Sequence, residues 1–152
     1  MNYYRMKVDF REQVVLFLVM FVVAICFNPM NMLAFRLSDL YISTTLVLSS
    51  LYMASTMVWA HEVFHYFYRG HFRTIVFWVG VFLSAVCVML LRTQLFVSPR
   101  QWLRRMIPHH STALTTTTQL LKNNKVDNQT YRLAKDIVIT QQMEIDAMKI
   151  LL

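Results

Sequence analysis

Long apolar runs separated by short polar segments occupy the first two thirds of the chain. The runs cover residues 14–27, 41–60 and 72–91. The last run has twenty residues, and a helix of that length rises about 30 Å, which matches the hydrocarbon core of a bilayer. The pattern therefore predicts three transmembrane helices, near residues 13–30, 40–62 and 71–93.

The first two runs differ from the third. Residues 14–27 would rise only about 21 Å as a helix, so this span needs flanking residues to cross the bilayer. Pro29 just after the run predicts a kink or a stop. Residues 41–60 contain seven serines and threonines. Small hydroxyl residues let helices approach closely in lipid, so we expect this span to pack inside a bundle.

The pattern changes after Arg92. Ser98 followed by Pro99 is typical of a helix start, and Asp127 or Asn128 can cap a second helix. We predict helices near 98–122 and 128–151. One face of the second helix should carry Leu133, Ile137, Gln141, Glu144, Met148 and Leu152. The chain is thus expected to be all-α, with a transmembrane region at 1–95 and an antiparallel helical hairpin at 96–152.

Composition supports a membrane location. Hydrophobic residues make up 57% of the chain and charged residues 15%, against about 25% charged residues in soluble domains. The net charge is +7, and most basic residues flank apolar runs, which favours lipid headgroups over nucleic acid as the partner. We therefore expect a multi-pass integral membrane protein, in a cell envelope or a virion membrane. The basic residues divide evenly between the two sides, so charge favours neither orientation.

Soft-metal ligands gather in the predicted hairpin. Met106 lies one helical turn from His109 and His110, and the second helix carries Glu144 and Met148 one turn apart. A turn centred near residue 125 would place Met106 opposite Glu144 and His109 opposite Gln141. Thioethers together with imidazoles suit copper, with zinc as the alternative ion. The predicted metal ligands are Met106, His109, His110, Glu144 and Met148.

The same segments resemble a known family. "MIPHHSTA" and "LAKDIVITQQMEIDAM" are similar to the pattern Met-x-x-His-His, then Gln-x-x-Glu-Ile-x-x-Met, of the bacterial family called domain of unknown function 305. Membrane-bound members also have spans before the motif. The resemblance implies a ferritin-like helical hairpin, and copper binding as in some members. "TTTTQ" and "KNNK" depart from the family's usual first-helix end.

A second motif competes for function. His61-Glu62-Val63-Phe64-His65 has the His-Glu-x-x-His form of zinc proteases, in which two histidines bind zinc and the glutamate acts as base. It falls in a belt rich in aromatic and histidine residues, typical of a membrane interface. No acidic third ligand follows Glu62 until Asp127. We interpret this match as fortuitous.

The preferred hypothesis is a small membrane protein with a copper-binding hairpin and no enzyme activity. The alternatives are a structural membrane subunit of a larger assembly or virion membrane without metal and, less favoured, a membrane-embedded zinc protease. Because a two-helix hairpin buries little apolar surface alone, we expect it to pack against a second copy or another membrane or assembly protein.

Overall fold

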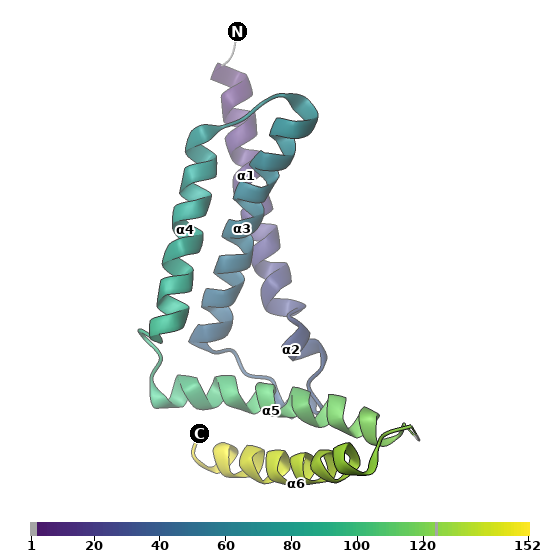
Figure 1. The fold of residues 1–152 in the computed structure, drawn as a ribbon. Coiled ribbons are helices and arrows are strands. Elements are labelled where there is room, and N and C mark those ends of the chain that lie inside the picture. The colour runs from purple at the N-terminus through teal and green to yellow at the C-terminus, as the bar shows by residue number, and fades with distance from the viewer. Residues whose placement is uncertain (1–2, 124) are drawn as a thin grey trace. The chain divides into compact units, whose positions relative to one another are not determined.

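The computed structural model describes residues 3–123 and 125–152, and every regular element in that part is helical (Figure 1). The predicted all-α class is confirmed. In chain order the elements are α1 Tyr3–Cys26, α2 Pro29–Met32, the 3₁₀ helix η1 Leu37–Asp39, α3 Thr44–Arg69, α4 Thr74–Thr93, α5 Pro99–Leu121 and α6 Asn128–Ile150.

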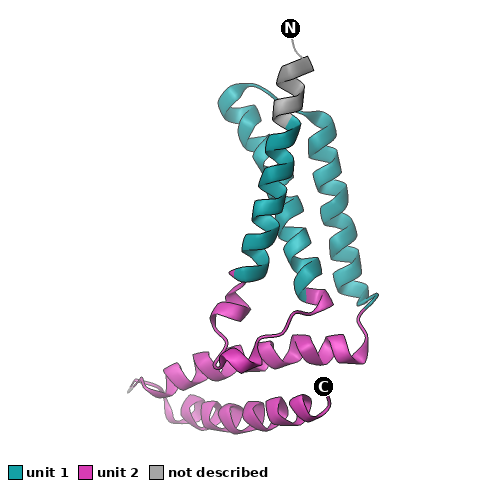
Figure 2. Cartoon of the chain, turned by 180° about the vertical axis from the view of Figure 1, so that it is seen from behind, with its two compact units in different colours: residues 1–26, 46–96 teal, residues 27–45, 97–152 magenta. Residues whose placement is uncertain are grey.

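These elements form two compact units, drawn in separate colours in Figure 2. The first unit contains α1, α3 and α4. The second unit joins residues 27–45 to residues 97–152, so that it contains α2, η1 and the hairpin of α5 and α6. No sequence pattern had indicated that residues 27–45 belong with the C-terminal hairpin.

Within the first unit, α3 and α4 approach closely at Gly80. A Cβ atom built on Gly80 would lie 3.1 Å from both the Cβ and the backbone nitrogen of Trp59. One turn further along α4, the Ser84 hydroxyl donates to the Ser55 hydroxyl at 3.0 Å. Small residues on both helices thus permit the close packing that the serine-rich pattern of residues 41–60 predicted.

Two helical segments are long and apolar enough to cross a membrane, namely Phe10–Met32 and Thr74–Thr93. Their apolar side chains lie largely on the outside, with Leu18 54% exposed and Ile75 80% exposed. Pro29 acts as a stop rather than a kink, because α1 ends at Cys26 and Pro29 begins α2 after the capping Asn28. Helix α3, which corresponds to the predicted span near 40–62, does not meet the same criterion of length and hydropathy.

The second unit is centred on the antiparallel pair α5 and α6 (Figure 1). Ser98 and Asp127 cap the two helices, as predicted, by accepting hydrogen bonds from backbone N–H groups. The buried core consists of Ile107, Leu114, Ile145 and Met148. The predicted inner face of α6 was partly wrong, because Leu133 is exposed whereas Ala134 and Ile145 are buried. The face is rotated by about one residue from the one expected.

Candidate functional site

The centre of the candidate site is the imidazole of His110 on α5. Its Nδ1 atom lies 2.8 Å from the backbone oxygen of Met106, and its Nε2 atom lies 2.8 Å from Oε2 of Glu144 on α6. A carbonyl oxygen only accepts hydrogen bonds, so Nδ1 carries a hydrogen and donates it. Nε2 then faces a carboxylate, and a favourable contact there requires a proton or a metal ion at that nitrogen.

Glu144 is held from its own helix as well. The Gln141 side-chain amide donates to Oε2 of Glu144 at 3.3 Å. The carboxylate is about half exposed, whereas the His110 side chain is mostly buried. The pair therefore lies at the edge of the hairpin, where an ion from solvent can reach it.

Two thioethers lie one turn away from this pair. Met106 precedes His110 by four residues on α5, and Met148 follows Glu144 by four on α6. Because the helices are antiparallel, both methionines fall on the same side of the His110–Glu144 contact. Met148 belongs to the buried core and Met106 packs against that core. Four of the five predicted ligands thus gather on the facing surfaces of α5 and α6.

His109 does not join this group. Its side chain is exposed, and its ring centroid lies 5.8 Å from that of His110 at a steep angle. Partial burial, Arg105 and His110 together lower the pKa of His109, in that order of importance, and so favour the neutral imidazole. Across the described residues, no cluster of three or more His, Cys, Asp or Glu side chains is placed to hold a metal ion.

The predicted register of the hairpin was wrong by one helical turn. We expected Met106 opposite Glu144, but His110 occupies that position. The midpoint between the two helix ends, Leu121 and Asn128, is close to the expected residue 125. The difference therefore arises from the offset of the two helices along their axes and not from the position of the turn. This offset pairs His110, rather than Met106, with the carboxylate.

The His-Glu-x-x-His segment lies near the C-terminal end of α3. His61 and His65 share a face, with ring centroids 4.1 Å apart, and the Gln13 side-chain amide lies 2.9 Å from Nδ1 of His61. Glu62 is fully buried and forms an ion pair with Arg73 at 2.7 Å. Arg73 thus neutralises the glutamate that a zinc protease would use as base.

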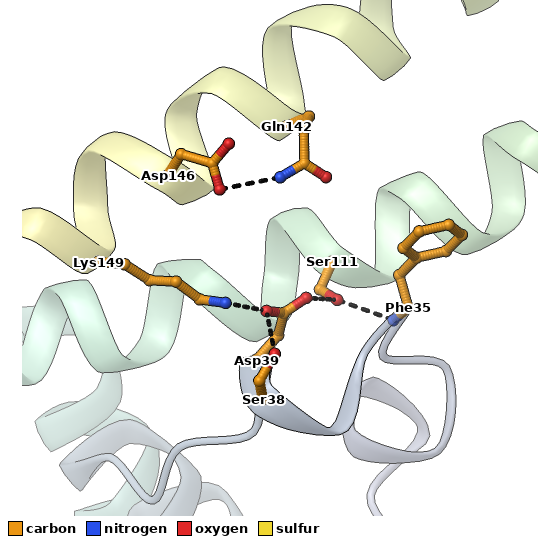
Figure 3. Close-up of polar contacts among 7 residues, drawn as sticks. All are labelled: Phe35, Ser38, Asp39, Ser111, Gln142, Asp146 and Lys149. Atoms are coloured by element: carbon orange, nitrogen blue, oxygen red, sulfur yellow. Dashed lines mark hydrogen bonds and ion pairs between the residues drawn. The ribbon is translucent and has the colours of Figure 1, made fainter.

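Asp39 is the residue that sequence reasoning missed (Figure 3). Its side chain is almost completely buried, and it accepts hydrogen bonds from Ser111 of α5 at 2.6 Å and from Lys149 of α6 at 2.5 Å. The Ser111 hydroxyl in turn accepts from the backbone N–H of Phe35 at 2.8 Å. This Asp39 cluster fastens residues 27–45 to both helices of the hairpin. The only available signal was an acidic residue between apolar runs at "RLSDLY".

Comparisons with known proteins relate the chain to one domain family and to a viral protein. The family described as Domain of unknown function (DUF305) matches residues 91–152, which include both helices of the hairpin. An uncharacterized protein of Acanthamoeba polyphaga mimivirus is 32% identical over 129 residues, a match that covers 82% of this chain and 81% of the viral protein. The chain belongs to the family of this viral protein. The residues of its hairpin are similar to DUF305, and the match to the viral relative extends well beyond them. No solved structure matches the chain.

Proposed function

We propose that this chain is a multi-pass membrane protein whose C-terminal hairpin binds a soft metal ion, copper, and has no catalytic activity. The observation that carries the metal proposal is the setting of His110, whose two ring nitrogens both face oxygen acceptors. Nδ1 donates its hydrogen to the Met106 carbonyl oxygen. Nε2 needs a positive partner between it and the Glu144 carboxylate, and a metal ion can replace the proton there.

The donor set fits copper better than a hard cation. His110 would supply an imidazole nitrogen, Met106 and Met148 thioethers, and Glu144 a carboxylate oxygen. Thioethers favour Cu(I), and the hydrogen bond to the Met106 carbonyl would hold the imidazole ring in one orientation. Bound copper would give the hairpin a redox-active ion. The residues of the hairpin would bind this ion and shield it from solvent. Zinc is the alternative ion, although it has less affinity for thioethers.

Exposed apolar surface supports the membrane part of the proposal. In the first unit, α1 and α4 leave large aliphatic and aromatic side chains uncovered, among them Val22, Phe82 and Met89. Lipid is the environment that such helices require. We propose α3 as a third span. Two of its hydroxyl groups are satisfied within the helix, since Ser50 and Thr56 donate to carbonyl oxygens four residues earlier.

Copper titration of the purified protein under reducing conditions tests the metal proposal. We expect one Cu(I) per chain, and His110→Ala should lower the affinity by about tenfold or more, since loss of even an outer-shell partner has that effect. His109→Ala is the matched control and should change the affinity much less. Equal losses in the two variants, or no copper binding by the wild type, would rule out this site.

The second candidate function is a structural membrane subunit without metal. The viral source of the relative favours a virion membrane as its setting. In this case the 2.8 Å contact between His110 and Glu144 serves only to join α5 to α6. His110→Ala would then reduce thermal stability in the absence of any metal, whereas copper would not raise the stability of the wild type.

A further inference from the structure

Helix α6 has an apolar stripe on the side opposite the hairpin core. Ile139 is 61% exposed and Met143 is 67% exposed, although both are large hydrophobic residues. They are separated by four residues and therefore share one helix face, on which Ile150 also lies. Ile145 and Met148, which are buried against α5, occupy the other side of the same helix. The stripe faces away from everything that the second unit packs against α6.

Charges at the two ends of the stripe make it complementary to itself. Arg132 lies seven residues before Ile139, and Asp146 lies seven residues after it. Both side chains are exposed. Seven residues are two helical turns, so all three residues lie along one line of the helix surface. In the described part of the chain, Arg132 has no carboxylate partner, and Asp146 accepts only from Gln142 of its own helix.

We propose that α6 is a homodimer interface in which the α6 helices of two chains pack antiparallel, with Ile139 on the twofold axis. Arg132 of each chain then meets Asp146 of the other. Lys135 lies against Met143, where its aliphatic stem covers the thioether. Each interface position is used twice, as twofold symmetry requires. The result is a four-helix bundle made of two hairpins.

Other antiparallel registers are less favourable. A pairing centred two residues later, at Gln141, brings Asp136 opposite Asp146 of the other chain, and like charges repel. A pairing centred on Met143 places no basic residue opposite Asp146. The register about Ile139 is the one that gives two ion pairs together with an apolar centre. The proposal does not depend on metal binding, because His110 of α5 and Glu144 of α6 contact each other within one chain.

Site-specific crosslinking of the full chain in proteoliposomes tests the interface. In a background with Cys26→Ala and Cys87→Ala, a single cysteine at the axis, Ile139→Cys, should form a disulfide-linked dimer under mild oxidation. Leu133→Cys is the matched control. Leu133 is also 61% exposed, but it lies on a different face of the same helix and should crosslink poorly. Equal crosslinking at the two positions, or none at Ile139→Cys, overturns the proposal.

A charge exchange provides the second test. Arg132→Glu alone and Asp146→Arg alone should each lower the association constant of the dimer by about fivefold. Each change removes two exposed ion pairs and places like charges opposite each other. The double variant should restore the wild-type value, as it recreates the pairs with reversed sign. Failure of the double variant to recover would exclude this register. A stripe that lies on the lipid surface would give single variants with the same dimer fraction as the wild type, which also overturns the proposal.

Discussion

Single polar residues with buried partners decide how the second unit is held together. Asp39 comes from the 3₁₀ helix η1, and its two oxygens accept from Ser111 and Lys149 on different helices of the hairpin (Figure 3). A buried carboxylate is stable only when it is paired and hydrogen-bonded. The Asp39 cluster therefore fixes residues 27–45 against α5 and α6 more specifically than apolar packing alone could.

Replacement of Asp39 should destabilise the second unit. Loss of one partner of a fully buried ion pair costs roughly 3–5 kcal/mol. Lys149 is 26% exposed and can turn toward water, so we expect Asp39→Ala to cost about 2 kcal/mol. Thermal unfolding in detergent, followed by helical circular dichroism, measures the effect. Ser38→Ala is the control. Ser38 is exposed, and its contact with Asp39 is a long hydrogen bond of 3.5 Å. An Asp39→Ala melting curve that coincides with that of Ser38→Ala would contradict this role.

The ends of the two hairpin helices were easier to predict than their faces or register. Both hairpin helices begin and end within one residue of the predicted positions, because Ser98 and Asp127 are local signals that act on the next few N–H groups. Helix α3 runs to Arg69, well beyond the predicted end near 62. Aromatic and histidine residues suggested an interface there, but they carry no helix breaker before Gly70, which has φ +64.

At Gly80, the contact between α3 and α4 leaves no room for a side chain. We expect Gly80→Leu to separate the two helices and to cost about 1–3 kcal/mol, as overpacking of a tight contact does. Ala85→Leu is the matched control, because Ala85 lies on the exposed side of the same helix. Melting temperatures of the two variants in detergent make the comparison. Equal melting temperatures for Gly80→Leu and Ala85→Leu would show that this close contact is unimportant.

The cap of α6 gives a pH-dependent contribution to stability. Hydrogen bonds from the backbone N–H and the side chain of Thr130 lower the pKa of Asp127. A carboxyl group whose pKa is lower in the folded state stabilises the fold above its unfolded pKa, and this contribution is lost as the pH falls through the folded value. The melting temperature of Asp127→Ala should thus lie below that of the wild type near neutral pH. The gap should narrow on acidification to about pH 3, and a gap independent of pH would show that the charge has no part in the cap.

For the whole molecule, sequence patterns predicted the helical class and the hairpin but not the grouping of segments into units. Hydrophobic periodicity describes neighbours along one helix. The attachment of residues 27–45 to the hairpin depends on Asp39, Ser111 and Lys149, which are far apart in sequence and have no periodic relation. The candidate metal site was found through the family resemblance and helical spacing. The contact of His110, rather than Met106, with Glu144 depended on the offset between α5 and α6, which helical spacing does not determine.

The number of spans has a direct consequence for topology. Three spans place the two ends of this chain on opposite sides of the membrane, whereas two spans place them on the same side. We predict three, with the hairpin on the outer side by analogy with envelope members of the family. Epitope tags at the two ends, probed by protease in sealed vesicles, distinguish these outcomes. Equal protection of both tags would show that α3 does not cross the membrane.

The long chain separation within the Asp39 cluster also matters during biosynthesis. Asp39 and Lys149 are 110 positions apart. At the usual rate of translation, roughly 5–20 residues per second, the carboxylate emerges from the ribosome roughly 5–20 seconds before its cation. In that interval α1, α3 and α4 are already synthesised, while residues 27–45 have no complete hairpin to hold them. A ribosome that stops before Lys149 therefore leaves a chain whose Asp39 carboxylate has no cation from α6 to pair with.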